Sequence, residues 1–438
     1  MTLRHPLIGK FGGATLSNPT KVIQWIDRWV AEAGPTVVVV SAREGVTDLL
    51  RSVIDAPRAR AQHVRVLNQI AELHPGLSME GRTRLVRLRR LVSEAERLRE
   101  VDAPLADRIL SQGERLAVHW LVPQLIAAGV PAVAVEADHL GLITDNRYGA
   151  STILLSRSAA RVRRTLVHWL RAGRVPIVTG FIGRSAEGRV TTLGMGGSDY
   201  TATALGGILR ASRVELVKRG VSVLTGDPRR IPAASPIARL SYEEAEELAQ
   251  FGAKVLHPLT VEPAREFGIE VHVIPLDDPK ATTVIGPKPG PGGMRALTLL
   301  SPVGLVRIRV PGGRQRPGVV AEVSRRLNAE GINIVTLFTS STLLSVVLEA
   351  AHAEQGRKAL QSLADRDRMI LDGPHRVALL TAIGDGVLRD VTRLSPAVLR
   401  FGEGLSATPR SVTLAVPARE AQRALVRLHR ALVERRTA

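Results

Sequence analysis

The chain has 438 residues, 45% of them hydrophobic and 23% charged, which is typical of a globular protein with two or three domains. It contains no cysteine, so disulfides, thiolate metal sites and cysteine nucleophiles are excluded. The net charge of +19 would suit a polyanion, but its arginines are interleaved with acidic residues and no aromatic–basic pattern accompanies them, so we expect no nucleic-acid partner.

Short β-rich runs alternate with helical patterns up to about residue 285. Continuous apolar runs predict buried strands at Val37–Val40, Ala132–Val135, Pro176–Val178 and Val271–Ile274. Apolar residues at helical spacing predict helices at Val22–Ala31, Leu116–Ala128 and Ala159–Ala172. This rhythm predicts an α/β fold, an open and mostly parallel sheet sandwiched by helices, with ligands at the carboxyl ends of strands. Residues 57–110 are predicted to be a helical insertion into this domain, which spans 1–285.

Residues 191–202 form a glycine-rich turn, Thr-Thr-Leu-Gly-Met-Gly-Gly-Ser-Asp-Tyr-Thr-Ala, which leads into a helix-compatible run at Tyr200–Arg210. Glycines allow the backbone to approach a ligand closely, and Ser198 and Asp199 are residue types that cap helix N-termini. Backbone N–H groups at such a helix start would suit a phosphate or a carboxylate. The same pattern is also typical of a tight loop without a ligand.

The segment Gly-Pro-Lys-Pro-Gly-Pro-Gly-Gly cannot sustain a helix or a strand, so a linker is predicted at 286–297. Beyond it, a strand–helix pattern occurs twice, which predicts two ferredoxin-like units at 298–370 and 371–438. The elements predicted in the first are Leu305–Val310, Gly318–Glu330, Ile332–Leu337, Leu343–Ala350 and Glu354–Ala364. Those predicted in the second are Arg376–Ile383, Asp385–Leu399, Ser411–Val416 and Ala418–Leu432.

Three distant segments carry a family resemblance: Lys10–Gly13 (Lys-Phe-Gly-Gly), the 194–199 turn, and 251–258 (Phe-Gly-Ala-Lys-Val-Leu-His-Pro). Together they resemble the aspartate kinases of the amino-acid kinase family. Further colinear matches lie at Val37–Asp48, 111–114, 180–183, 223–229 and 240–245. The C-terminal repeat resembles paired ACT domains, on Arg-Pro-Gly-Val at 316–319 and Gly-Ile-Asn-Ile at 331–334, although the second copy lacks a clear Gly-Ile-Asn equivalent.

The resemblance implies that ATP phosphorylates the side-chain carboxylate of L-aspartate to 4-phospho-L-aspartate, the first step toward lysine and threonine. Because that nucleophile is already ionised, no general base is needed, and catalysis rests on alignment and charge neutralisation. The implied catalytic residues are Lys10, Asp199 and Lys254. The implied substrate-binding residues are Ser41, Thr47, Glu114 and Ser198. The implied nucleotide-binding residues are Lys10, Gly12, Gly13, Leu224, Asp227, Arg229 and Lys254. Mg²⁺ would be held mainly by the phosphates, and no protein metal site is predicted.

Several positions depart from the family pattern. Met195 stands where the family has an arginine that grips a substrate carboxylate, a contact worth roughly 2–4 kcal/mol unless another cation such as Arg43 replaces it. In the nucleotide segment, Arg219 replaces an acidic residue and Ser222 replaces a turn glycine, while Lys218 occupies a position that varies.

Three functions therefore remain open on the sequence. The first is an active aspartate kinase regulated by an amino acid at its ACT domains. The second is a kinase for a related acidic amino acid, which Met195 favours. The third is a catalytically impaired regulatory homologue, which Arg219 and Ser222 favour.

The ACT resemblance implies a homodimer and an effector near Gly312–Pro317 and Asn333, and it does not identify the effector. No apolar run reaches the roughly 18 residues of a membrane helix, and no apolar segment follows a basic start. We therefore expect a cytoplasmic protein without a signal peptide or a membrane partner.

Overall fold

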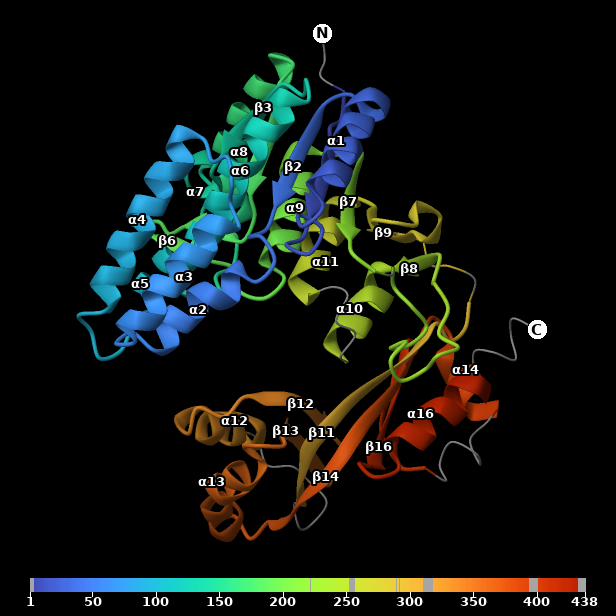
Figure 1. Cartoon of the computed structure of the whole chain (residues 1–438). Helices are drawn as coiled ribbons and strands as arrows, with labels where there is room; N and C mark the ends of the chain where they lie inside the picture. The colour runs from blue at the N-terminus through green and yellow to red at the C-terminus, as the bar shows by residue number, and fades with distance from the viewer. Residues whose placement is uncertain are drawn as a thin grey trace. The chain divides into compact units, whose positions relative to one another are not determined.

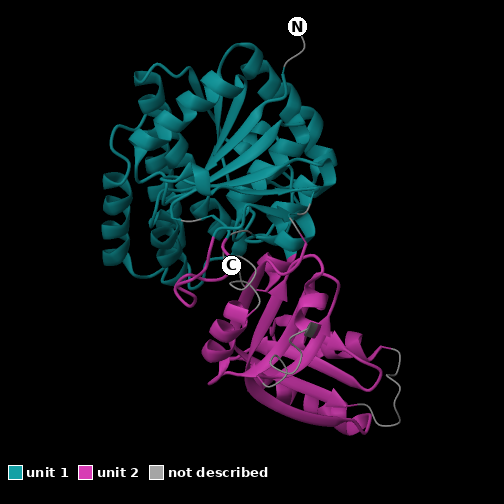
Figure 2. Cartoon of the chain, turned by 90° about the vertical axis from the view of Figure 1, so that its right-hand side faces the viewer, with its two compact units in different colours: residues 1–223, 236–246, 255–290 teal, residues 224–235, 247–254, 291–438 magenta. Residues whose placement is uncertain are grey.

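The computed structural model describes residues 4–220, 222–251, 257–288, 290, 292–309, 318–393 and 401–431. The chain forms two compact units (Figure 2). The first comprises residues 1–223, 236–246 and 255–290, and the second comprises 224–235, 247–254 and 291–438. Across the described ranges, no helix combines the length and the apolar character needed to cross a membrane.

The first unit is built on an eight-stranded sheet with the order β3-β4-β2-β1-β7-β9-β10-β8 (Figure 1). Its strands are β1 Leu7–Phe11, β2 Thr36–Val40, β3 Ala132–Val135, β4 Val175–Thr179, β7 Arg213–Lys218, β8 Arg239–Ser241, β9 Val271–Pro275 and β10 Thr283–Gly286. All neighbours pair in parallel except β9 and β10. The four predicted strands all lie in this sheet, and Figure 2 shows helices on both of its sides, so the predicted fold class is confirmed.

Ten helices lie wholly in the described part of the first unit, and an eleventh, α10, lies there only up to residue 246, since its residues 247–250 belong to the second unit. They are α1 Pro19–Ala33, α2 Val46–Asp55, α3 Arg60–Glu72, α4 Met79–Ala95, α5 Ala103–Leu110, α6 Gln112–Ala127, α7 Ala137–Leu140, α8 Leu155–Arg171, α9 Gly197–Leu209, α10 Tyr242–Gln250 and α11 Pro258–Phe267. The predicted insertion at 57–110 contains α3, α4 and α5. A short hairpin, β5 Ile182–Arg184 and β6 Val190–Thr192, precedes α9, and a 3₁₀ turn, η1 Pro279–Ala281, precedes β10.

Helix α1 shows how the sequence fixes local structure next to the central strand. The Asn18 side chain accepts a hydrogen bond from the Lys21 N–H and so caps the helix, whose first residue is a proline. Its apolar face buries Trp29, whose ring lies against Gly9 of β1, where a Cβ would come within 2.1 Å of it. Trp29 Nε1 donates to Glu215 Oε2 of β7 at 2.6 Å. The helix is thereby tied to the two strands that carry the candidate site.

The register of the sheet aligns the ends of its central strands. Phe11, the last residue of β1, pairs with Val40 on one side and with Val217 on the other. The segments that follow β1, β2 and β7 therefore leave the sheet at one edge, where ligands of open α/β sheets bind.

The second unit is built on a six-stranded antiparallel sheet with the order β12-β13-β11-β14-β16-β15 (Figure 1). Its strands are β11 Ala296–Arg309, β12 Ile334–Thr339, β13 Leu343–Glu349, β14 Ile370–Ile383, β15 Glu403–Ala407 and β16 Ser411–Pro417. Its described helices include α12 Val319–Ala329, α13 Ala353–Arg366, α14 Val387–Arg393 and α16 Ala421–His429. Each second-unit element predicted from the sequence overlaps one of these, although several bounds differ by one to three residues, and residues 310, 394–399 and 432 lie outside the described ranges.

Three features of the second unit differ from the sequence predictions. Strand β11 begins at Ala296, inside the predicted linker, and β14 crosses the predicted boundary at 370/371. Both strands are 14 residues long and pair with each other, so the two ferredoxin-like halves share one sheet. The polar segment 372–376 interrupts the apolar pattern of β14, and the first half of this strand was therefore not predicted from the sequence. Strand β15 was not predicted because it is a partly exposed edge strand that contains glycine and serine.

Candidate active site

Two lysines converge on one buried carboxylate at the carboxyl edge of the central strands. Lys10 Nζ, from β1, lies 2.5 Å from Asp199 Oδ1, and Lys218 Nζ, from the end of β7, lies 2.8 Å from Asp199 Oδ2. Lys10 is 6% exposed and Asp199 is 5% exposed. One carboxylate thus faces two ammonium groups, which leaves this cluster with a surplus of positive charge.

The protonation states of this cluster follow from burial and charge. Burial lowers the pKa of Lys10, and the ion pair with Asp199 partly opposes that effect. Burial also disfavours the Asp199 carboxylate, but Lys10 and Lys218 together outweigh it and hold the pKa of Asp199 well below its usual range. Asp199 is therefore an ionised bridge between two cations, not a proton acceptor.

The glycine turn after β1 borders the same space. A Cβ added to Gly12 would lie 3.5 Å from Lys10 Nζ, so this backbone runs beside the ammonium group. A Cβ on Gly13 would lie 2.5 Å from the carbonyl oxygen of Ala42, in the loop after β2. Glycine at both positions leaves room for a ligand and lets the two loops pack closely.

The 194–199 turn opens helix α9, as predicted, but Ser198 and Asp199 are not its cap. The N-cap is Gly196, which has φ of 74° in the left-handed region, and no side chain caps the helix. A Cβ on Gly196 would lie 2.4 Å from the Cβ of His257, which further requires glycine. Ser198 and Asp199 lie in the first turn, and Ser198 packs so closely on Gly180 that a Cβ there would be 2.5 Å away. The positive end of the 13-residue α9 dipole thus points at the lysine cluster.

Glu114, at the start of α6, offers one buried oxygen to a ligand. Its Oε1 accepts a hydrogen bond from the Ala42 N–H at 3.0 Å, whereas its Oε2 is buried without a hydrogen-bond partner. Burial raises the pKa of Glu114 to about 7, against the opposing effects of the Ala42 N–H and Lys10. A ligand ammonium group would satisfy Oε2 and favour the charged carboxylate. Ser41, in the same loop as Ala42, and Thr47, in the first turn of α2, are both half-buried.

Met195, which departs from the family pattern at the substrate site, and Arg43, the cation that could replace the missing arginine, lie in different surroundings. The Met195 side chain is 85% exposed, so it contributes little to the packing of the turn. The Arg43 guanidinium lies 4.0 Å from the centre of the Trp120 ring of α6, and its Nε is buried without a partner. The Arg43 guanidinium therefore packs against α6 in this conformation.

The nucleotide-segment departures are also accommodated locally. Arg219 forms a double ion pair with Glu44, of the loop after β2. The left-handed turn conformation lies at Gly220, with φ of 99°, so the chain places its turn glycine two residues before the buried Ser222.

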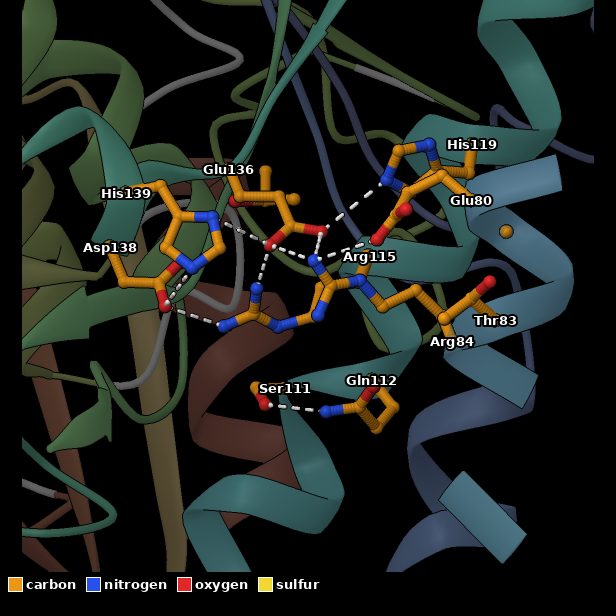
Figure 3. Close-up of polar contacts among 12 residues, drawn as sticks. Glu80, Thr83, Arg84, Ser111, Gln112, Arg115, His119, Glu136, Asp138 and His139 are labelled. Atoms are coloured by element: carbon orange, nitrogen blue, oxygen red, sulfur yellow. Dashed lines mark hydrogen bonds and ion pairs between the residues drawn. The ribbon is translucent and has the colours of Figure 1, made fainter. Parts of the chain in front are cut away.

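A buried ionic network anchors the helix that carries Glu114 (Figure 3). Arg115 of α6 contacts Glu136 and lies 2.7 Å from Asp138, while Arg84 of α4 lies 2.9 Å from Glu136. Burial disfavours the Glu136 carboxylate, but His119 and the arginines outweigh it and lower its pKa. The spacing of Glu136, Asp138 and His139 would also fit a metal ion, but the two arginines already neutralise both carboxylates. We therefore assign this network a structural role.

The structure brings most of the predicted site residues into the first unit. These are Lys10, Gly12, Gly13, Ser41, Thr47, Glu114, Ser198 and Asp199. Leu224, Asp227 and Arg229 belong to the second unit, where the exposed Arg229 pairs with Asp227 at 3.0 Å. Lys254 and the predicted effector loop at 312–317 lie outside the described residues.

Two residues of the site region carried no prediction. Lys218 is the last residue of β7, and a basic residue at the carboxyl end of a parallel strand is the signal that could have found it. Asp107, of α5, accepts hydrogen bonds from the Gly149 N–H at 3.1 Å and from the Thr192 N–H at 2.8 Å. It thereby fixes β6, which leads directly into the 194–199 turn. No local sequence pattern indicates that contact.

A model of the amino acid kinase family matches residues 6–275 of this chain. Lysine-sensitive aspartokinase 3 of Escherichia coli (strain K12) is 30% identical over 98% of this chain and 99% of that protein. Aspartokinase 1, chloroplastic, of Arabidopsis thaliana is 31% identical over 78% of this chain, and this chain covers 63% of that protein, less than two thirds of its length. The crystal structure of E. coli aspartokinase III in complex with aspartate and ADP (R-state) matches with a TM-score of 0.80 and 26% identity, over 97% of this chain and 99% of that chain.

Proposed function

The chain belongs to the amino acid kinase family, and we propose that it transfers the γ-phosphoryl group of ATP to the side-chain carboxylate of L-aspartate. The product is 4-phospho-L-aspartate, an acyl phosphate. The relatives named aspartokinase and the fold shared with a structure that holds aspartate and ADP support this reaction. The observation that carries it in this chain is the buried Lys10–Asp199–Lys218 cluster beside the Gly12–Gly13 turn.

The reaction needs positive charge more than it needs a base. The aspartate side chain is ionised near neutral pH, so it attacks the γ-phosphorus directly and ADP leaves. Lys10 binds the phosphoryl oxygens, on which negative charge is spread during transfer, and Gly12 and Gly13 add backbone N–H donors. Asp199 holds the Lys10 ammonium group in place through the 2.5 Å ion pair. Lys254 is proposed as a further catalytic cation from the family resemblance alone.

The amino-acid substrate is held by the loop after β2 and by the starts of α6 and α9. Glu114 Oε2 accepts the substrate ammonium group, because it is a buried oxygen without a partner. Ser41, after β2, Thr47, in the first turn of α2, and Ser198, in the first turn of α9, are proposed to contact the substrate through their hydroxyl groups. This arrangement predicts that a substrate lacking the α-amino group binds poorly.

The nucleotide requires a divalent cation, and among the described residues Asp199 is not available to bind it. Both oxygens of Asp199 already face ammonium groups, so this carboxylate is committed to lysines. The donor set therefore fits Mg²⁺ that is held mainly by the phosphates, where it neutralises their charge. Leu224, Asp227 and Arg229 are proposed as nucleotide contacts of the second unit.

The second unit is proposed to regulate the first as a pair of ACT domains, 298–370 and 371–438, with 1–285 as the kinase domain. One relative is named lysine-sensitive, so lysine is the first effector to test. A cytoplasmic homodimer is proposed on the same resemblance.

A hydroxylamine assay tests the reaction. Purified protein is mixed with ATP, Mg²⁺ and hydroxylamine, which traps acyl phosphates as hydroxamates, and with aspartate, glutamate or other acidic amino acids. Hydroxamate formed with aspartate, and lost in a Lys10→Met variant, supports the proposal. Turnover only on another acid would favour the related kinase that Met195 makes the second candidate. No turnover on any acid would overturn kinase activity and leave the regulatory homologue.

A further inference from the structure

The second lysine of the cluster is not explained by the roles assigned so far. Lys218 is the last residue of β7, and its ammonium group lies 2.8 Å from Asp199 Oδ2. Asp199 is already paired with Lys10 at 2.5 Å, so neutralising this carboxylate requires only one lysine.

We propose that Lys218 is a second phosphate-binding cation of the transfer site, which contacts the terminal phosphates of the nucleotide together with Lys10. This inference rests on the proposed function only for the identity of the anion, a nucleotide with terminal phosphates. It adds a residue that the family resemblance did not assign.

The charge of the cluster supports an anionic ligand. Two ammonium groups face one carboxylate, and both Lys10 and Asp199 are more than nine-tenths buried. Two positive charges held close together in such surroundings favour an anionic ligand beside them. Glu114 does not remove the surplus, because its free oxygen is proposed to take the substrate ammonium group. The cluster is therefore completed by a ligand that carries negative charge.

The geometry indicates where that anion lies. Strands β1 and β7 are adjacent and parallel, so Lys10 and Lys218 reach Asp199 from neighbouring strand ends. Asp199 itself lies in the first turn of α9, whose positive end favours an anion. The Lys218 side chain is 23% exposed and that of Lys10 is 8% exposed, so Lys218 is the more accessible of the two. A phosphate that enters from solvent meets Lys218 before it reaches Lys10.

The neighbouring Arg219 does not provide the same charge. Its guanidinium is held by Glu44 through two contacts, at 3.0 and 2.6 Å. Lys218 is therefore the residue of this strand end whose charge is directed into the cluster.

The test measures equilibrium binding of ATP, ADP and AMP to the full-length protein by calorimetry, with and without Mg²⁺. We expect Lys218→Met to weaken ATP binding about tenfold or more, ADP binding less, and AMP binding less than about twofold. Lys218→Arg should retain most of the ATP affinity because it keeps the positive charge. The matched control is Lys21→Met, which removes an exposed lysine of α1 that pairs with Asp277.

Three outcomes would overturn the inference: unchanged ATP affinity in Lys218→Met, an equal loss for ATP and AMP, or an equal loss in the Lys21→Met control. An equal loss for all nucleotides would indicate that Lys218 only stabilises the fold, which a drop in Tm would accompany. If the methionine variant does not fold, Lys218→Thr is measured in the same series. Absence of hydroxamate with the wild-type protein would overturn the proposed function, but would leave this nucleotide series interpretable.

Discussion

Glu44 and Arg219 form a double ion pair between the two strands that flank β1. Arg219 Nη1 lies 3.0 Å from Glu44 Oε2, and Nη2 lies 2.6 Å from Oε1. Glu44 follows β2, Arg219 follows β7, and β1 lies between these strands in the sheet. The arginine that replaces an acidic residue of the family thus has an acid of its own as a partner. Its presence is therefore a weaker argument for lost activity than the sequence alone suggested.

Removal of the Glu44–Arg219 pair should change the free energy of unfolding and the activity only slightly. Both side chains are about half exposed, and exposed ion pairs contribute roughly 0–1 kcal/mol. In a double-mutant cycle of Glu44→Ala and Arg219→Ala, we expect a coupling free energy of unfolding below about 1 kcal/mol that declines at high salt. Both single variants should keep hydroxamate formation within about tenfold of the wild type. A loss of activity specific to Arg219→Ala would instead place this arginine on the nucleotide.

Lys10→Met should abolish transfer while preserving the fold. Lys10 supplies positive charge where negative charge develops, so we expect kcat to fall at least about 100-fold. The variant still has Lys218 to pair with Asp199, so the free energy of unfolding should change much less than activity. Steady-state hydroxamate kinetics and thermal unfolding measure the two effects. A Lys10→Met variant with near-normal kcat would contradict the catalytic role.

Glu114 should impart a pH dependence on aspartate binding. Its pKa is raised to about 7 without substrate, and the substrate ammonium group binds its ionised form. The KM for aspartate should therefore increase as pH falls below about 7, because Glu114 becomes protonated. Glu114→Gln should raise KM and remove this part of the pH profile. A Glu114→Gln variant that retains the wild-type profile would show that another group titrates.

Ionisation of Glu114, which favours aspartate binding, lowers the free energy of unfolding. The folded pKa of Glu114, about 7, lies above the ordinary glutamate value of 4.5, so the folded state binds the proton more tightly. This contribution to the free energy of unfolding is present below about pH 4.5 and is lost as pH rises through 7. Glu114→Gln should flatten that decline in urea unfolding measured across the interval.

Much of the first unit could be predicted from the sequence, and the reasons are local. Continuous apolar runs such as Val37–Val40 fit only a strand buried on both faces. The glycine turns beside Lys10 and Asp199 also indicate that the backbone there lies close to neighbouring groups. The predicted N-cap was wrong because Ser198 and Asp199 fit a cap by residue type, whereas the left-handed backbone at Gly196 decides where α9 begins.

What could not be predicted depends on contacts between distant segments. The pairing of Lys218 with Asp199 follows from β7 lying next to β1, an order that no local pattern contains. The Glu44–Arg219 pair joins residues 175 positions apart for the same reason. Burial cannot be read from charge either, because Arg115 and Glu136 are residue types that are mostly exposed and yet form a network inside the first unit.

Met195→Arg should tighten aspartate binding. The side chain at this position is 85% exposed, so an arginine there should leave the free energy of unfolding almost unchanged. A guanidinium group beside the glycine turn can bind the substrate α-carboxylate through two hydrogen bonds, and we expect KM to fall about tenfold or more. Met195→Gln is the matched control, since it adds a polar group without charge. An unchanged KM in Met195→Arg would show that this turn does not contact a substrate carboxylate.

Arg115→Met should destabilise the first unit strongly. Arg115 is 3% exposed and contacts both Glu136 and Asp138, so its removal leaves buried carboxylates short of a cation (Figure 3). Breaking such a buried pair costs about 3–5 kcal/mol, and the loss should be visible as a lower urea midpoint. Arg108→Met is the control, because Arg108 pairs with Glu94 at the surface and should cost less than about 1 kcal/mol. Since α6 also carries Glu114, any folded Arg115→Met protein should show a raised KM for aspartate with a smaller change in the KM for ATP. Equal stability losses in the two variants would mean that the network contributes no more than a surface pair.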